Sequence, residues 1–230
     1  MDQLIGVGLY TPAEAGSLLR IPVLKISRWL KGHSTKKKSY DPLWTPEIDL
    51  GDDRLFLGFR DLMEVRVADA FISAGVSAMK VRKAISVARD TIGFDYPLSS
   101  ARFRTDGREI FLQIIEVDEK GEERERLLNL FRKQYEFKSV IDPILKTMEF
   151  GEDGTPVLWW PEGRKAKIVV DPSRAFGQPI DAVSSVPTAI LAAAAKQEGV
   201  RGTAIAYDVP LSSVHRAVSF ERSLEQRMAA

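Results

Sequence analysis

The sequence predicts an α+β fold in three consecutive parts, and three patterns lead to this prediction. Short amphipathic helical patterns fill residues 1–93, turn and strand signals around one helical stripe fill residues 94–166, and alanine-rich helical patterns follow a short apolar run in residues 167–230. With 44% apolar residues in a chain of 230, each part can bury a core. We therefore expect two mainly helical parts on either side of a small α+β module.

The basic residues near the amino terminus are concentrated in one segment that lacks acidic residues. No acidic residue lies between Glu14 and Asp41, although the whole chain is nearly neutral, with 33 Lys and Arg against 32 Asp and Glu. A locally basic surface binds a polyanion because neutralised phosphates release condensed counterions. Double-stranded DNA is therefore the first partner to test.

Composition excludes several classes of protein. The chain has no cysteine and two histidines, so thiolate chemistry and Cys-based zinc sites are impossible, and we predict neither a metal site nor a cofactor. It contains no glycine loop of the kind that binds phosphate groups and no nucleophile elbow. We therefore expect no catalytic residues and no enzyme activity. No apolar run approaches the roughly 20 residues of a membrane span, and we expect a cytoplasmic protein.

Two short helices with a tight turn are predicted first. Thr11 and Glu14 have the spacing of a capping box, with Pro12 at the first helical position. After a break at Pro22, a second apolar stripe continues until Gly32. This outline is a helix-turn-helix.

The second helix presents polar and basic side chains away from its apolar stripe. These are Lys25, Ser27, Arg28 and Lys31. Side chains three and four residues apart share one helix face, and such a face fits a DNA major groove. The alternative is that these charges only keep a small helix hydrated.

A wing is predicted after this helix. Residues 33–39 are small, polar and basic, and they include Lys36, Lys37 and Lys38. A hairpin here would place the lysines on the phosphate backbone, where they would fix register without reading bases. The apolar run 55–57 is predicted to be a strand of the same wing, and a solvated loop is the alternative.

Further helices are predicted to begin at Phe59 and after Ser77, and the order of these motifs resembles a known family. The residues that carry the resemblance are Tyr10, Thr11, Ala15, Arg28, Trp29, Phe59, Asp61, Leu62, Gly75, Val76, Ser77, Val81, Arg82 and Ile85. Together they are similar to the winged helix-turn-helix domain at the head of MerR-type transcriptional regulators. The resemblance implies base contact by Lys25 and Arg28 and phosphate contact by the lysines at 36–38.

In the middle part, Asp106-Gly107 between two strand-like runs, 101–104 and 109–114, predicts a β-hairpin. A helical stripe over 140–148 and a turn at 152–155 before a strand at 156–160 complete the predicted α+β module.

The last part is predicted to contain a short strand at 168–170 and three helices: one from Thr188 to Gly199, one at 203–207 and one at 211–227. The three helices contain a second helix-turn-helix outline. Acidic residues dilute its few basic groups, so we assign DNA contact to the first outline and dimerisation or protein contact to the second.

This part resembles the small helical domain found in VapB-like antitoxins. The resemblance rests on Asp171-Pro172, the run 176–179, the run 186–188, the run 205–209, Val214, Ala217 and Phe220-Glu221. It implies an antitoxin and transcriptional autorepressor that neutralises a PIN-domain ribonuclease toxin, as a homodimer or a hetero-oligomer with the toxin. We expect Arg222 or Arg227 to reach among the toxin's carboxylates. The alternatives are a ligand-responsive regulator without a toxin partner and a protein-interaction adaptor without a DNA role.

Overall fold

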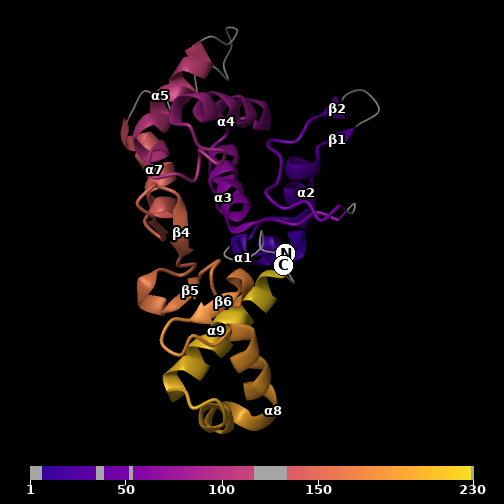
Figure 1. Cartoon of the computed structure of the whole chain (residues 1–230), viewed down its shortest axis with the longest axis vertical. Coiled ribbons are helices and arrows are strands. Elements are labelled where there is room, and N and C mark those ends of the chain that lie inside the picture. Colours follow the sequence, from indigo (N-terminus) through magenta and orange to yellow (C-terminus); the bar gives the residue numbers. More distant parts are fainter. Residues whose placement is uncertain (1–6, 35–38, 52–53, 117–133, 229–230) are drawn as a thin grey trace.

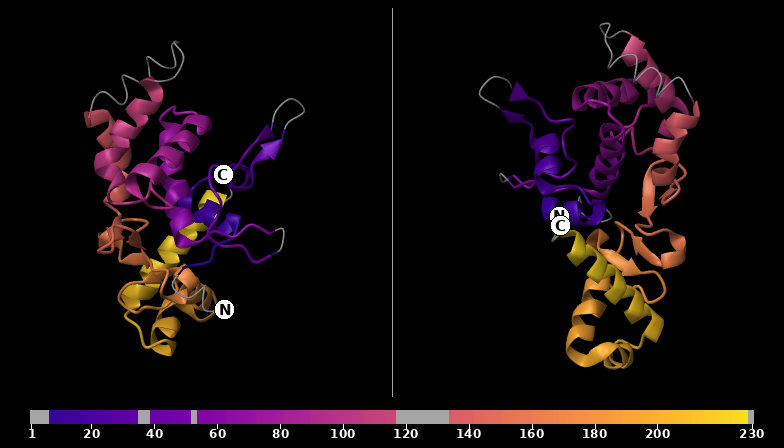
Figure 2. Two further views of the ribbon diagram at one scale, coloured as in Figure 1. Left: turned by 45° about the horizontal axis from the view of Figure 1, so that its top comes forward. Right: turned by 180° about the vertical axis from the view of Figure 1, so that it is seen from behind.

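The computed structural model describes residues 7–34, 39–51, 54–116 and 134–228. The molecule is elongated (Figure 1). The helices α4 (Ala78–Ile92), α5 (Phe103–Glu116) and α7 (Gln134–Leu145) lie at one end, and α8 (Thr188–Ala206) and α9 (Leu211–Met228) lie at the other. A small hairpin of β1 and β2 projects sideways from the body in all three views (Figure 2). The hairpin therefore extends away from the helices of the amino-terminal part.

The amino-terminal elements follow the sequence signals closely. They are α1 (Pro12–Leu19), α2 (Val23–Lys31), β1 (His33–Ser34), β2 (Ser39–Tyr40), α3 (Phe59–Ser73) and α4 (Ala78–Ile92). The predicted capping box is present, since the Glu14 amide donates to the Thr11 hydroxyl and the Glu14 carboxylate accepts from the Thr11 amide at 2.8 Å. Gly32 ends α2 with a positive φ of 71°, and the Ser77 hydroxyl caps α4. These starts and stops are confirmed.

The predicted run at 55–57 forms less sheet than expected. Only Leu57 makes a bridge, and its partner is Tyr10 rather than the hairpin. The two residues exchange backbone hydrogen bonds of 2.8 and 2.9 Å. This segment therefore ties the start of the chain to the start of α3.

The β-hairpin predicted around Asp106-Gly107 is wrong. Residues Phe103–Glu116 form one helix, α5, which contains both the proposed turn and the proposed strand. Phe103, Gly107 and Phe111 follow at helical spacing, and a side chain at 107 would collide with the Phe103 ring. Phe103 and Phe111 pack on Phe71 of α3 with ring centroids 6.0 and 4.7 Å away. Burial of this aromatic face outweighs the local turn preference of Asp-Gly.

A four-stranded antiparallel sheet follows α7 (Gln134–Leu145). Its strands lie side by side in chain order: β3 (Met148–Phe150), β4 (Pro156–Trp159), β5 (Ile168–Val170) and β6 (Pro179–Asp181). Short 3-10 turns, η2 (Arg164–Ala166) and η3 (Ala175–Gly177), connect the later strands. The predicted helical stripe is confirmed over 140–145 but not at Met148, which lies in β3. The turn at 152–155 and the strands at 156–160 and 168–170 are confirmed with small shifts of their ends.

The carboxy-terminal helices are α8 (Thr188–Ala206) and α9 (Leu211–Met228). Gly199 breaks α8 with φ 74° and ψ 161°, so this element consists of two helical pieces, as the sequence predicted. The described residues form a mixed α and β structure with two small antiparallel sheets. The predicted α+β class is therefore confirmed. None of the described helices is both long and apolar enough to cross a membrane.

Two junctions between the amino-terminal part and later segments include polar contacts of Tyr10 and Arg66. The Leu9 amide donates to the Phe176 carbonyl at 3.0 Å, and the buried Tyr10 hydroxyl donates to the Gly177 carbonyl at 2.7 Å. Gly177 has φ 80°, and a Cβ there would overlap the Tyr10 hydroxyl, so glycine is required for this joint.

Arg66 of α3 makes the second junction. Its guanidinium lies 5.1 Å from the centre of the buried Trp159 ring and donates to the Ile144 carbonyl at 3.3 Å. Burial lowers the pKa of Arg66 to about 10. A cation held in this way links α3, α7 and β4.

Glu64 makes the stability of the fold depend on pH. Its carboxyl group is fully buried on α3 and accepts from the amides of Leu98 and Ser99 at 3.0 and 2.8 Å. Burial raises the pKa of Glu64 to about 7, and the two amides only partly oppose the shift. The folded state therefore keeps the Glu64 proton at pH values where the unfolded chain has released it. The stability that this proton contributes is fully present below the pKa of the unfolded chain and is lost as pH rises through 7.

We predict that the Glu64 ionisation lowers the free energy of unfolding by on the order of 3 kcal/mol between pH 5 and pH 8. Urea unfolding of Glu64→Gln should show a weaker decline over this range than the parent chain, with the exposed Glu198→Gln as control. Parallel pH profiles for Glu64→Gln and the parent would contradict the assignment.

Candidate nucleic-acid interface

The orientation of α2 is set by its apolar stripe. Ile26, Trp29 and Leu30 are buried in the core against α1, and the Leu43 amide donates to the Trp29 carbonyl at 2.7 Å. The opposite face therefore points outward. It carries the polar residues that the sequence assigned to DNA.

The structure places these residues at different degrees of exposure. Arg28 and Lys31 are exposed, whereas Lys25 and Ser27 are half-buried. Arg28 forms no ion pair within the described part of the chain. Lys25, by contrast, is paired with a carboxylate of α3.

That carboxylate belongs to Asp69. Lys25 Nζ lies 2.6 Å from Asp69 Oδ1, and it also lies 4.9 Å from the centre of the Trp29 ring. Nothing in the sequence indicates this pair, since 44 residues separate its members and neither stands in a recognisable motif.

A groove of about 680 Å³ runs along this face of the protein. Residues of α2, of the β1–β2 hairpin and of the first turns of α4 line it together, including Lys25, Arg28, His33, Tyr40 and Arg82. Two of the cations that the sequence assigned to DNA, Lys25 and Arg28, therefore face one groove together with His33 of the hairpin and Arg82 of α4. Lys31 is exposed on the same helix but does not line the groove.

The hairpin that forms one wall is antiparallel. His33 pairs with Tyr40 and Ser34 with Ser39, and the rings of His33 and Tyr40 stack with centroids 4.7 Å apart. The predicted phosphate-binding residues Lys36, Lys37 and Lys38 lie outside the described residues.

Arg82 of α4 holds the base of the hairpin. Its Nε donates to the Pro42 carbonyl at 2.9 Å and its Nη2 donates to the Asp41 carbonyl. Since carbonyls carry no net charge, Arg82 keeps its positive charge beside the groove. No local pattern in the sequence indicates this contact, since 40 residues separate Arg82 from Pro42.

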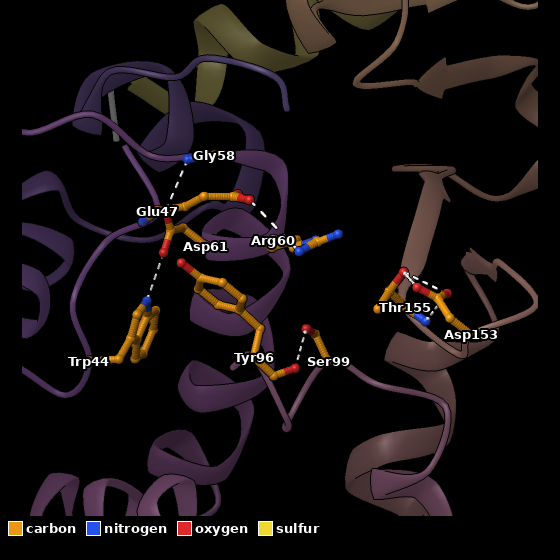
Figure 3. A network of polar contacts seen from close by, with 9 residues as sticks. All are labelled: Trp44, Glu47, Gly58, Arg60, Asp61, Tyr96, Ser99, Asp153 and Thr155. Atoms are coloured by element: carbon orange, nitrogen blue, oxygen red, sulfur yellow. Dashed lines mark hydrogen bonds and ion pairs between the residues drawn. The ribbon is translucent and has the colours of Figure 1, made fainter. Parts of the chain in front are cut away.

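A buried carboxylate fixes the segment between the hairpin and α3. The Asp61 carboxylate accepts from Trp44 Nε1 at 2.8 Å and from the amides of Glu47 and Gly58 at 2.9 and 3.0 Å (Figure 3). The Tyr96 hydroxyl is a further donor. Burial raises the pKa of Asp61 from its usual value, and these donors oppose the shift.

The second helix-turn-helix outline is less basic at its surface. Arg216 is committed to an internal ion pair, with its Nη2 2.7 Å from Oδ1 of the buried Asp181. Arg222 is exposed on α9, whereas the side chain of Arg227 lies outside the described residues. His215 is exposed, and no cluster of three metal-binding side chains occurs within the described ranges.

The same region exposes apolar side chains. Ile205 is 83% exposed at the end of α8, and Tyr207 and Leu211 at the following turn are 41% and 42% exposed. Exposed apolar groups that lie close together in the chain are typical of protein contact surfaces.

Arg82 generates a prediction about the hairpin. We expect Arg82→Met to lower the free energy of unfolding by about 2 kcal/mol, since it removes two charge-assisted hydrogen bonds. Amide hydrogen exchange of residues 39–43 should become faster, while the exposed neighbour change Lys83→Met should leave it unaltered. Unchanged exchange in Arg82→Met would show that the hairpin base is held by other contacts.

Comparisons with known proteins give two similarities. The chain is 28% identical over 184 residues to the "Putative antitoxin VapB45" of Mycobacterium tuberculosis, a match that spans 76% of this chain and 77% of that protein. It also resembles the crystal structure of Rv2018 from Mycobacterium tuberculosis, with a TM-score of 0.72 and 25% identity over 93% of this chain and 99% of that one. No protein-family model matches the chain. The resemblance to VapB-like antitoxins therefore has support in a curated protein over most of the length of both.

Proposed function

We propose that this protein is an antitoxin that binds a PIN-type ribonuclease and represses transcription by binding operator DNA. The similarity to VapB45 over about three quarters of both chains is the observation that carries the antitoxin part. The transcriptional part is supported by the groove in which α2, the hairpin and α4 present basic side chains together.

The proposed DNA surface consists of the outer face of α2 and the hairpin. Arg28 enters the major groove, Lys31 and Ser27 contact its edge or the backbone, and Lys36, Lys37 and Lys38 contact phosphates. α2 has only nine residues, so a single copy reads a short sequence. Operators of this kind are normally read by two-fold dimers, and we propose a homodimer on DNA.

The proposed toxin surface lies on the carboxy-terminal helices. Ile205, Tyr207 and Leu211 supply exposed apolar area, and Arg222 lies on the next helix, with Arg227 near its end. The internal pair of Arg216 with Asp181 fits this division, because it removes a cation that DNA contact would use.

For DNA binding, we predict that Arg28→Ala weakens binding to the specific site by about 1–3 kcal/mol, because a base contact in the major groove is lost, with little effect on the slope of log affinity against log salt. Changing Lys36, Lys37 and Lys38 to Ala should lower this slope by about 0.9 for each phosphate that these lysines neutralise. Gel-shift titrations over a salt series with the upstream region of the gene measure both. The matched control is Arg201→Ala, an exposed cation of α8; if only this change lowers the slope, the DNA surface lies on the carboxy-terminal helices.

For toxin binding, we predict that Ile205→Glu abolishes co-purification of the product of the neighbouring gene, because a carboxylate replaces the most exposed apolar side chain of the surface. Val157→Glu, on the exposed side of β4, should leave co-purification unchanged. Ribonuclease assays on the complex test the inhibitory arginines separately: full inhibition by a chain with Arg222→Ala and Arg227→Ala would remove these two residues from the mechanism.

A further inference from the structure

The outer face of α2 contains one cation, Lys25, whose charge is balanced by a carboxylate of the same chain. Lys25 and Arg28 lie one helical turn apart and both line the groove. Lys25 is bound to a carboxylate of a neighbouring helix, whereas Arg28 forms no ion pair within the described ranges. The two residues therefore differ in the charge that they can offer to a polyanion.

We propose that Asp69 is a positioning residue that withholds Lys25 from DNA, so that Arg28 is the cation of this turn that contacts the duplex. The inference rests on the proposed DNA binding and refines it. It assigns to Lys25 no contact with DNA, in contrast to the base contact that the resemblance implied.

The geometry of the pair supports this assignment. The Lys25 ammonium and the Asp69 carboxylate are 2.6 Å apart, with side chains 35% and 26% exposed. Partial burial weakens solvent screening of the attraction compared with a pair on an open surface. The ammonium also lies over the face of Trp29, whose ring is buried in the core, so Lys25 has two fixed partners.

The placement of Asp69 explains why DNA would not easily displace it. Asp69 stands on α3, most of whose residues are buried, and it reaches Lys25 of α2, the helix that also carries Trp29. A phosphate that attracts Lys25 must leave the Asp69 carboxylate unpaired in a partly buried position and near a second negative charge. This cost disfavours the exchange of partners.

Two consequences for DNA recognition follow. Lys25, held by its two partners, contributes little to binding of random sequence, which depends on the number of available cations that neutralise phosphates. Arg28, with a planar group that can make two parallel hydrogen bonds, remains to read the groove. Asp69 would thereby favour specific over non-specific binding.

Salt titration of binding to a random-sequence DNA duplex tests the proposal with the full chain. We expect Lys25→Met to leave the salt slope unchanged, because Lys25 is already neutralised. Asp69→Asn should increase the slope by about 0.9 and tighten binding about eight-fold at 0.1 M salt, as one cation becomes available. In the double variant Lys25→Met with Asp69→Asn, this gain should disappear.

Asp90→Asn is the control for a change in overall charge, since Asp90 is an exposed carboxylate of α4. It should give a much smaller gain than Asp69→Asn, and the gain should persist in the presence of Lys25→Met. Thermal unfolding of each variant verifies that the chain is folded. A purely structural role of Asp69 would change thermal stability but not the number of released ions.

The outcomes separate the inference from the proposed function. If Lys25→Met alone lowers the slope by about 0.9 while Asp69→Asn has no effect, the ion pair opens on DNA and the role of Asp69 is refuted, although DNA binding stands. If no variant and no parent protein binds the duplex in a salt-dependent way, the DNA-binding function fails and the inference fails with it.

Discussion

The arrangement of the amino-terminal part depends on one buried carboxylate, that of Asp61. It lies in the first turn of α3 and gathers donors from three separate segments, namely Trp44, the backbone at 47 and 58, and Tyr96. A carboxylate without these donors would be costly in the core, and the donors without it would be unsatisfied. The long segment after the hairpin is thereby fixed on α3, although its composition is that of a loop.

This constraint reaches the groove through two short steps along the chain. Leu43, next to Trp44, bonds to the end of α2, and Asp41 and Pro42 before it accept from Arg82 of α4. The hairpin base is therefore held between α2 and α4 by hydrogen bonds to its backbone. These contacts fix the walls of the groove, and Arg82 supplies the only side chain that takes part in them.

The sequence predicted the elements whose ends are marked by local chemistry. The capping box at Thr11, the glycine after α2 and the Ser77 cap all act within one turn of helix, and each is where the residues indicated. The hairpin predicted at Asp106-Gly107 was wrong because the deciding contacts, those of Phe103 and Phe111 with Phe71, come from a distant segment. Similarly, the cationic face of α2 was predicted, but its pairing with Asp69 was not, since only tertiary packing brings α3 beside Lys25.

The same reasoning explains why two similar helix-turn-helix outlines are assigned different partners. Basic residues occur in both, and their number alone does not separate them. The difference lies in what each cation contacts: Arg28 faces a groove, whereas Arg216 is bound to the buried Asp181, which also accepts from the Ser184 amide at 2.8 Å. A guanidinium used to satisfy a buried carboxylate holds α9 on the sheet and cannot also neutralise a phosphate. The exposed apolar residues beside it, with Ile205 foremost, then favour a protein rather than DNA at this end of the molecule.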